Sequence, residues 1–392
     1  MPTLQTLKTR LKGFPPVGEL NARLQARRVK KQYAQTVYHY EQQHPPAGFE
    51  ELLERRAGDR LRRLRSRRDS LNIFFLGTDE LQDRSGILQA VEKLGRLAYF
   101  TKEGGEYGQV PSNGQPFQSR RAANTARLLA LFQDLASRGC VPDILFGQMW
   151  GSLVEGQGLA SIRERYGTLV VSICMDDRHA YLRGKSTGTH ALIPHIDLAA
   201  TAAPECVDWY LKEGCPSVFF PEASDPAIFR PMPELPKAHD VTFIGGRYGI
   251  RDKLLRTLQR AGVQVTACGQ GWEQGRLPTE EVPRVLAQSR IILGVGTIGY
   301  CEDFYALKLR DFDAPMTGSF YLTHANPDLD HVYRVGEEIQ TYGSIGECVT
   351  KAHYFLERAA EREAIAQRGC ARARAEHTWE VRFRSLLDRF LS

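Results

Sequence analysis

The sequence predicts an α/β protein with two domains, each built around a parallel sheet. Short apolar runs alternate with helical patterns from residue 72 onward, which is typical of consecutive βαβ units. A proline-rich stretch over residues 225–240 interrupts this alternation, and a second alternation begins after it. At 392 residues, the chain is also longer than a single hydrophobic core usually supports.

This organisation divides the chain into four expected segments: a basic helical extension (1–70), a first sheet domain (71–234), a second sheet domain (235–376) and a C-terminal helix (377–392). His377, Thr378 and Trp379 interrupt the helical pattern that precedes the last segment. The final helix has an apolar stripe that must be buried. We therefore expect it to cross back to the first domain.

The N-terminal extension carries the positive charge of the protein. Residues 1–70 hold 16 Lys or Arg against 7 Asp or Glu, whereas the other 322 residues hold 36 against 39. Leu53, Leu61 and Leu64 lie among many arginines, which predicts a basic amphipathic helix. Its leucines would pack on the protein, or its arginines would hold an anionic partner such as nucleic acid or a membrane surface. No aromatic residues interleave with the arginines for base stacking, so we favour packing.

The first domain opens with a strand at residues 72–77, a helix at 86–94 and a strand at 97–100. Asp79 and Asp83 lie in the loop after the first strand. That loop is at the carboxyl edge of the sheet, where open α/β folds bind their ligands. The loop lacks a GxGxxG pattern, so a dinucleotide site is not indicated.

Further strands of the first domain are expected at 143–146, 169–174, 198–201 and 218–220. The strand at 169–174 ends at Asp176 and Asp177, with His179 close by. Acids in this position bind a metal, act as a base or hydrogen-bond a loop, and the further oxygen ligands of a Mg²⁺ site are not evident. Our candidate catalytic residues are Asp79, Asp176 and His179, with no metal site.

The second domain begins with a strand at 240–244 and a loop containing Gly245, Gly246 and Arg247. The later elements are helix 250–261, strand 263–267, helix 279–288, strand 291–293, a helix carrying Lys308, Arg310 and Asp313, and strand 320–323. We expect the strand series to end near Tyr321. Glycine loops before helices let an anion approach backbone N–H groups, so this domain suits phosphate and ribose. The alternative is that Lys308, Arg310 and Asp313 form only the solvent-exposed charged face of an ordinary helix.

Six stretches in the second half appear together and in order: FIGGRYGIR, GQGW, LPTEEVPRVLAQSRIIL, KLRDFDAPMTGSFYLT, VGEEIQTY and EHTWEVR. Together they resemble the C-terminal half of glycosyltransferases with two facing Rossmann-like domains, the GT-B fold. The nearest group is the CgeB-like (spore-maturation) glycosyltransferases. The first domain matches this family only in outline, through its strand–loop–helix opening, Asp176-Asp177 and the DPAIFRP sequence of the proline-rich stretch that links the two domains.

This resemblance implies a metal-independent enzyme that uses a nucleotide-diphosphate sugar, such as a UDP-sugar, as co-substrate. The second domain would bind the donor and the first domain the acceptor, with chemistry in the cleft between them. The implied donor-binding residues are Gly245, Gly246, Arg247, Gly271, Trp272, Lys308, Arg310 and Asp313. Arginines and lysines would face the diphosphate, Asp313 the ribose hydroxyls and Trp272 the base.

The sequence departs from the family pattern at two positions. Gly294 stands where the family often has Asn, and Asp313 replaces a Glu. Two other functions stay open: transfer to a DNA base or other nucleic acid, with the basic extension holding phosphates, and a non-catalytic sugar-nucleotide-binding scaffold. The eight cysteines lie apart with no CxxC pair, and no run of about 18 apolar residues is present. We therefore expect a cytoplasmic protein without a transmembrane segment.

Overall fold

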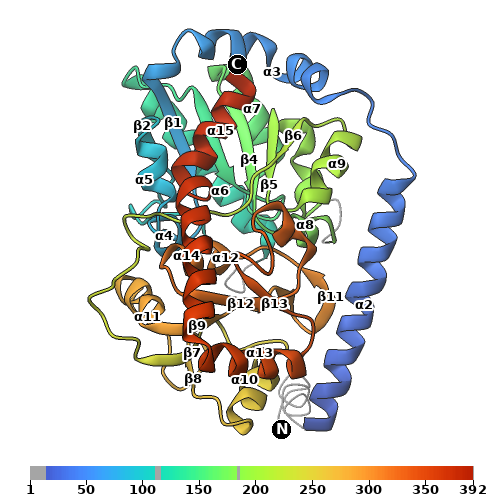
Figure 1. The fold of residues 1–392 in the computed structure, drawn as a ribbon. Helices are drawn as coiled ribbons and strands as arrows, with labels where there is room; N and C mark the ends of the chain where they lie inside the picture. The colour runs from blue at the N-terminus through green and yellow to red at the C-terminus, as the bar shows by residue number, and fades with distance from the viewer. Residues whose placement is uncertain (1–14, 111–115, 183–185, 392) are drawn as a thin grey trace. The chain divides into compact units, whose positions relative to one another are not determined.

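The chain folds into two compact units (Figure 1). The structure is a computed structural model that describes residues 15–110, 116–182 and 186–391. Unit 1 combines the described residues up to His39 with Arg230–Ala371, and unit 2 combines Tyr40–Phe229 with Arg372 to the end of the described chain. The predicted N-terminal extension is thus shared between the units, and its residues 1–14 lie outside the described ranges.

Unit 2 is built on a six-stranded parallel sheet with the order β2-β1-β3-β4-β5-β6. Its strands are β1 (Leu71–Leu76), β2 (Gly95–Tyr99), β3 (Ile144–Gln148), β4 (Leu169–Cys174), β5 (Leu198–Thr201) and β6 (Ser217–Phe219). All six residues of β4 are buried, as expected for a central strand covered by helices on both faces.

The helices of unit 2 are α3 (Phe49–Arg65), α4 (Glu80–Asp83), α5 (Ile87–Glu92), α6 (Phe117–Ser137), α7 (Gly156–Tyr166), α8 (Asp177–Leu182), α9 (Pro204–Lys212) and α15 (Trp379–Leu391), with 3-10 turns at Arg68–Ser70, Thr189–Ala191 and Ile193–His195. Phe132 of α6 packs on Phe74 of β1, with ring centroids 5.0 Å apart. Contacts of this kind close the hydrophobic core against the sheet.

Helix α3 packs on unit 2 through its leucines, and its arginines bind groups of the same unit. Leu53, Leu61 and Leu64 are buried, which confirms the packing interpretation for this helix. Arg56 donates to three backbone carbonyls, and Arg60 pairs with the buried carboxylate of Asp197 at 2.5 Å. These side chains satisfy groups of unit 2 that burial would otherwise leave without partners.

Helix α2 (Pro15–Glu41) belongs to unit 1 up to His39. Lys30 pairs with Asp303 at 2.6 Å, and the rings of Tyr33 and Phe304 lie 5.3 Å apart. The Lys30–Asp303 pair is exposed and contributes little stability, so the aromatic contact is the firmer attachment of this helix.

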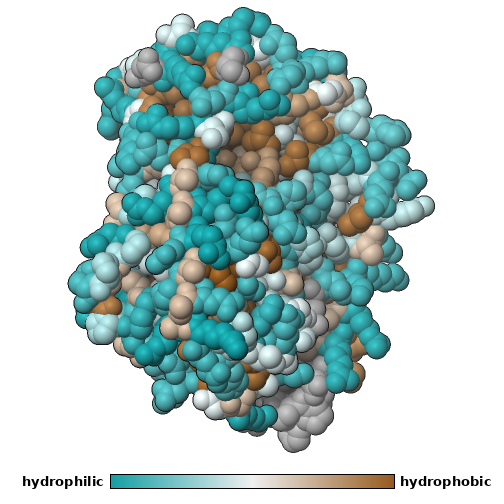
Figure 2. All heavy atoms as spheres, viewed as in Figure 1, coloured by the Kyte–Doolittle hydropathy of each residue, from teal (hydrophilic) through white to brown (hydrophobic). Residues whose placement is uncertain are grey.

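The last helix, α15, packs within unit 2 against α3 and α5. Phe383 is fully buried, and its ring centroid lies 5.3 Å from those of Phe146 and Phe220. Trp379 N donates to Ser224 O at 3.1 Å at the start of the helix. In the space-filling view, hydrophobic residues gather in the upper part of the visible face, in the region of β4, β6 and α15 (Figure 2).

Unit 1 contains a five-stranded parallel sheet with the order β13-β12-β9-β7-β8. Its strands are β7 (His239–Ile244), β8 (Val265–Cys268), β9 (Ser289–Leu293), β12 (Phe320–His324) and β13 (Gln340–Tyr342), and β10 (Thr297–Ile298) with β11 (Cys301–Tyr305) forms a separate hairpin. The expectation that the strands end near Tyr321 is wrong. Strand β13 follows it and pairs with β12, although three residues provide no apolar run to predict it from.

The remaining helices of unit 1 are α10 (Arg251–Arg260), α11 (Val282–Ala287), α12 (Arg310–Met316), α13 (Ile345–Glu357) and α14 (Ala359–Glu376, whose last turn belongs to unit 2), with 3-10 turns at Thr279–Glu281 and Pro327–His331. The predicted helix carrying Lys308 begins only at Arg310, so Lys308 precedes it. In the described ranges, no helix is long and apolar enough to cross a membrane.

Candidate functional site

The loop after β7 meets the loop after β8 at the carboxyl edge of the unit 1 sheet. Gly245 N donates to Cys268 O at 2.8 Å, and Trp272 Nε1 donates to Gly245 O at 2.7 Å. A Cβ atom on Gly269 would lie 2.3 Å from Gly245 O, so the two loops approach this closely only with glycine there. The structure thus brings together five predicted donor-binding residues: Gly245, Gly246, Arg247, Gly271 and Trp272.

Arg247 is exposed on this loop and has a carboxylate partner. Its Nη2 lies 2.6 Å from Asp252 Oδ1, and its Cζ lies 5.2 Å from the Trp272 ring centroid. The same guanidinium reaches Gly271 O at 3.4 Å. A bound diphosphate would therefore compete with Asp252 for Arg247.

Two further arginines lie at this loop, Arg251 in the first turn of α10 and Arg310 in the first turn of α12. Arg251 is 5% exposed, and its Nη1 donates to Gly246 O at 2.9 Å. The Cζ atoms of Arg251 and Arg310 lie 5.4 and 5.0 Å from the centroid of the Phe243 ring. Neither guanidinium forms an ion pair with any carboxylate in the described ranges of the chain.

This pair of arginines creates a positively charged site for which the described residues supply no counter-ion. Burial, together with the positive charge of Arg310, lowers the pKa of Arg251. The Nε of Arg251 is buried and has no hydrogen-bond partner. A buried cation without a counter-ion costs free energy, and a bound anion reduces that cost. The arrangement therefore suits a diphosphate.

Asp311 and Asp313 on α12 have different surroundings. Asp311 is buried, accepts from Tyr321 Oη at 2.5 Å and accepts from Lys308 N at 2.6 Å. Arg310 therefore does not pair with Asp311, which is a structural residue. Asp313 is half-buried on the same helix.

The structure explains why glycine occupies position 294. A Cβ atom on Gly294 would lie 2.1 Å from Tyr321 Oη and 2.3 Å from Thr323 Oγ1. The Gly294 carbonyl also accepts from Tyr342 Oη at 2.7 Å. Side chains of β12 thus fill the space that a residue such as Asn would need.

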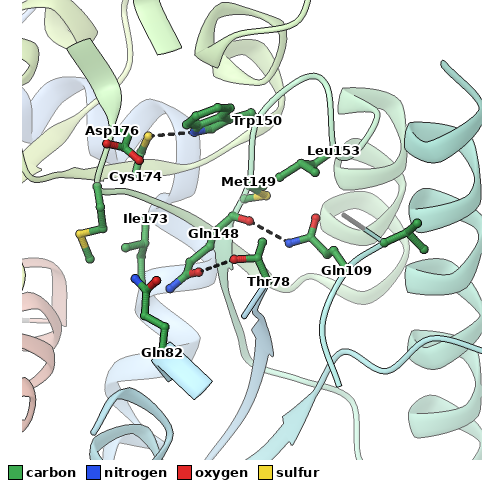
Figure 3. Close-up of a pocket in the computed structure, with 12 residues that line it drawn as sticks. Thr78, Gln82, Gln109, Gln148, Met149, Trp150, Leu153, Ile173, Cys174 and Asp176 are labelled. Carbon is green, nitrogen blue, oxygen red and sulfur yellow. Dashed lines mark hydrogen bonds between the residues drawn. The ribbon is translucent and has the colours of Figure 1, made fainter. Parts of the chain in front are cut away.

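Unit 2 contains a cavity of about 330 Å³ at the carboxyl edge of its sheet, beyond the ends of β1, β3 and β4. Figure 3 shows the residues that line it: Thr78, Gln82, Gln109, Val110, Gln148, Met149, Trp150, Leu153, Ile173, Cys174, Met175 and Asp176. Trp150 Nε1 donates to Cys174 Sγ at 3.1 Å, which fixes the orientation of the indole.

Asp83 is fully buried next to this cavity. It accepts from Tyr107 Oη at 2.7 Å and from Gln148 Nε2 at 3.0 Å. Burial raises the pKa of Asp83 to about 6, against the lowering effect of these hydrogen bonds. Asp83 therefore holds Gln148 in place, and its own charge is disfavoured.

The three candidate catalytic residues have different positions in unit 2. Asp176 lines the cavity. Asp79 is exposed and caps α4 by accepting from Leu81 N and Gln82 N at 3.0 and 3.4 Å. His179 is half-buried on α8 and is not among the residues that line the cavity. The neighbouring Asp177 is buried and accepts from Tyr210 Oη at 2.8 Å, so it serves the core.

Sequence reasoning did not single out Gln109, Gln148 or Trp150. Gln148 and Trp150 follow the predicted strand at 143–146, so the rule that ligands bind at the carboxyl edge could have found them. Gln109 has no such local signal, because it reaches the cavity from the long loop after β2.

Residues 251–388 match a protein-family model described as "Glycosyl transferase-like". This match covers about a third of the chain. A sequence search of curated proteins finds no match.

Comparison with solved structures finds proteins of similar fold. Sucrose-phosphate synthase of Thermosynechococcus elongatus aligns with a TM-score of 0.61 at 12% identity, over 81% of this chain and 98% of that one. Anabaena HepE, solved in complex with UDP-glucose, aligns with a TM-score of 0.58 at 12% identity, over 81% and 99%. AviGT4, a glycosyltransferase involved in avilamycin A biosynthesis, aligns with a TM-score of 0.53 at 12% identity, over 82% and 97%.

These likenesses confirm the predicted α/β class with two parallel-sheet, Rossmann-like domains. The chain therefore has the GT-B fold of glycosyltransferases, and its residues 251–388 have a glycosyltransferase-like sequence.

Proposed function

We propose that this chain is a glycosyltransferase that moves a sugar from a nucleotide-diphosphate sugar to an acceptor hydroxyl. The observation that carries the proposal is the pair Arg251 and Arg310, which place positive charge beside Gly245 and Gly246 and have no carboxylate partner among the residues that the structure describes. The glycosyltransferase-like sequence of residues 251–388 supports the same conclusion.

The arginines would act on the leaving group. In the reaction, the bond between the anomeric carbon and the diphosphate oxygen breaks, and the acceptor oxygen bonds to that carbon. Negative charge develops on the departing diphosphate. Cations and N–H dipoles that are already in place stabilise this charge more in the transition state than in the ground state. Arg251, Arg310 and the first turn of α10 supply them.

Metal independence is part of this proposal. In the part of the chain that the structure describes, no three His, Cys, Asp or Glu side chains gather as a metal site. Metal independence still stays a prediction, because a nucleotide's own phosphates also supply metal ligands. Reactions with and without added Mg²⁺ or EDTA test it directly.

The other donor contacts follow the family resemblance. We assign Asp313 to the ribose hydroxyls, Trp272 to the base, and Arg247 and Lys308 to further phosphate charge. The HepE structure contains UDP-glucose, which makes UDP-sugars the first donors to test. The CgeB-like group remains our proposal for the nearest relatives, and a cytoplasmic location remains a prediction.

We assign the catalytic base to Asp176. Of the three candidate residues, it is the one that lines the cavity of unit 2. The acceptor hydroxyl would give its proton to Asp176 as its oxygen bonds to the sugar, which balances the step.

A nucleic-acid acceptor is less well supported than a small acceptor. The basic extension would have to hold phosphates, yet Arg56 binds backbone carbonyls, Arg60 pairs with Asp197 and Arg67 pairs with Asp143, all within unit 2. A non-catalytic sugar-nucleotide-binding protein would bind donor without turnover. Release of nucleotide from a donor sugar distinguishes it from an enzyme.

The test is a donor panel of UDP-, GDP- and dTDP-sugars, read by thermal shift on the full chain. We expect one nucleotide class to raise Tm, and Arg310→Met to abolish the shift. Arg290→Met is the matched control, because Arg290 pairs with Asp240 at the opposite end of β7. No shift with any donor, or equal shifts in both variants, would contradict the proposal.

A further inference from the structure

The positive charge of the N-terminal extension lies mainly before residue 41. Residues 1–40 hold 8 Lys or Arg against 1 Asp or Glu, a net charge of +7. Residues 41–70, which include α3, hold 8 against 6, a net charge of +2. The arginines of α3 that bind groups of unit 2 therefore account for little of this charge. Most of it belongs to the sequence of α2 and the residues that precede it.

Helix α2 carries three exposed basic side chains for which the described ranges supply no counter-ion. Arg27, Arg28 and Lys31 are exposed and form no ion pair with any described carboxylate. Lys30 differs, because it pairs with Asp303. The sequence contains no Asp or Glu from residue 20 to residue 40. Cations grouped in this way, without acids among them, attract an anionic surface.

Two leucines of α2 are exposed close to these cations. Leu20 and Leu24 are 59% and 55% exposed, and elsewhere in the described ranges Leu81 is the one exposed leucine. Single exposed leucines are common on protein surfaces. Residues four apart on a helix are neighbours, so Leu20 and Leu24 form a joint apolar surface whose contact with water costs free energy.

Helical periodicity places the leucines and the cations on one face. Positions 4, 7, 11 and 18 residues after Leu20 fall close to whole turns of 3.6 residues. The side chains at these positions are exposed and share a stripe, which we call the α2 stripe: Leu20, Leu24, Arg27, Lys31 and Tyr38. The leucines occupy its N-terminal part, the cations its middle and Tyr38, which is 65% exposed, its C-terminal end.

The opposite face of α2 holds the helix on unit 1. Ala22 is buried, and Val29 and Tyr33 are half-buried. The Tyr33 ring centroid lies 5.3 Å from that of Phe304 in β11. This attachment directs the α2 stripe away from unit 1, so the stripe can meet a partner.

Cations and leucines on one stripe match the surface of a phospholipid bilayer. Anionic headgroups attract lysine and arginine, and leucine side chains enter the boundary between headgroups and acyl chains. Tyrosine also favours this interface. A nucleic acid would bind the cations through its phosphates but would leave both leucines in water. The apolar pair therefore favours the lipid surface.

We propose that the α2 stripe docks on a membrane surface that contains anionic phospholipid. Leu20 and Leu24 enter the headgroup region, and Arg27, Arg28 and Lys31 lie against the phosphates. Docking of this kind is peripheral and reversible, because the helix lies in the plane of the surface. The proposal is independent of the donor site, and it brings unit 1 to the membrane.

The test is co-sedimentation of the full-length protein with vesicles of phosphatidylcholine alone and of phosphatidylcholine mixed with phosphatidylglycerol. We expect binding to the mixed vesicles and at least about tenfold weaker binding to the neutral ones, because only the former attract the cations. Raising NaCl from about 0.05 M to about 0.5 M should weaken binding, since salt screens exposed charges.

A variant that combines Arg27→Gln, Arg28→Gln and Lys31→Gln should bind the mixed vesicles about a hundredfold more weakly. The matched control removes three exposed arginines from other helices, through Arg65→Gln, Arg165→Gln and Arg260→Gln. These arginines likewise form no ion pair with a described carboxylate. The control should keep most of the wild-type affinity, because the same loss of charge falls outside the α2 stripe.

A variant that combines Leu20→Gln and Leu24→Gln should weaken vesicle binding about tenfold, because the apolar contribution is lost. Leu81→Gln is its control. All the replaced side chains are exposed, so each variant should keep a Tm close to that of the wild type. Loss of binding is then read as loss of contact rather than of fold.

The proposal is wrong if the protein binds neither kind of vesicle, binds both equally, or if either α2 variant binds like its control. Binding to duplex DNA that exceeds vesicle binding and is unchanged in the leucine variant would identify nucleic acid as the partner instead. Dimerisation of the wild type without vesicle binding, abolished in the leucine variant, would show that a second copy covers the α2 stripe.

Discussion

Arg310 lies directly against the backbone of Gly245. A Cβ atom on Gly245 would come within 2.8 Å of Arg310 Nη2, and the Arg310 guanidinium also covers the ring of Phe243 at 5.0 Å. The absence of a side chain at position 245 thus determines where this cation sits. Gly245 is therefore a positioning residue for the proposed diphosphate site.

Gly245→Ala tests this relationship. The new methyl group should displace the flexible end of Arg310 and lower the affinity for UDP-sugar about tenfold, as expected for a lost charge-assisted contact. The fold should survive with some loss of stability, because a guanidinium end moves easily but the φ of 158° at Gly245 strains a residue with a Cβ. Calorimetry measures the affinity, and Gly346→Ala is the control, with no neighbouring atom closer than 4.0 Å to its Cβ position. An unaltered affinity in Gly245→Ala would place the diphosphate elsewhere.

Arg251→Met should separate stability from binding. The substitution removes a buried cation that has no carboxylate partner within the described part of the chain, so the free energy of unfolding of the unliganded protein should stay constant or rise. Donor binding should weaken by roughly 2–5 kcal/mol, since the ligand's charge loses its partner. Urea denaturation and calorimetry measure the two quantities. A variant that loses stability but keeps its donor affinity would show that Arg251 is purely structural.

The two acids of α12 should respond in opposite ways. Asp311→Asn disturbs the bonds to Tyr321 and Lys308 N, so we expect a loss of about 1–3 kcal/mol in the free energy of unfolding. Asp313→Asn should lower donor affinity about tenfold, because ribose hydroxyls lose a charged acceptor. If Asp313→Asn lowers the free energy of unfolding and leaves the donor affinity unchanged, the ribose assignment is wrong.

Asp83 should make the stability of unit 2 depend on pH. Burial raises its pKa from 3.8 to about 6, so the folded state binds this proton more tightly than the unfolded chain does. Its contribution to the free energy of unfolding is therefore fully present below pH 3.8 and decreases as pH rises towards about 6, by roughly 3 kcal/mol in total. In Asp83→Asn, the free energy of unfolding should therefore decrease less over the same pH range.

The measurement is urea denaturation of wild type and Asp83→Asn at several pH values between about 4 and 7, comparing slopes rather than absolute stabilities. Asp177 has a pKa of about 6 for the same reason of burial. An Asp83→Asn, Asp177→Asn double variant should flatten the profile further. Parallel wild-type and Asp83→Asn profiles would show that Asp83 titrates normally in the fold.

Phe383 should be essential for attaching α15 to unit 2. The ring is fully buried between Phe146 and Phe220. Phe383→Ala should lower the free energy of unfolding by about 3–5 kcal/mol because it leaves a cavity. Arg384→Ala is the control on the exposed face, with an expected change below about 0.5 kcal/mol. Tryptophan fluorescence measures the unfolding, and three of the four tryptophans, Trp150, Trp209 and Trp379, lie in unit 2. Equal stabilities of the two variants would contradict this packing.

Much of the fold follows from local sequence patterns. The apolar runs of β4 and β5 predict strands whose bounds match the structure, because a strand buried on both faces needs continuous apolar residues. The glycines after β7 likewise predict a loop that lets a ligand approach the backbone. These features depend on neighbouring residues alone, so the sequence by itself determined them.

Other features were decided by the tertiary structure. Strand β13 has three residues, and only its pairing with β12 makes it a strand. Arg251 and Arg310 are distant in sequence, but Arg251 follows β7 and Arg310 precedes β12. In the sheet order β13-β12-β9-β7-β8, only β9 lies between these two strands, so both arginines reach the ring of Phe243. Gln109 joins the cavity through a long loop. Charges and amides act on what lies within a few ångströms, and such distances between remote residues exist only in the folded chain.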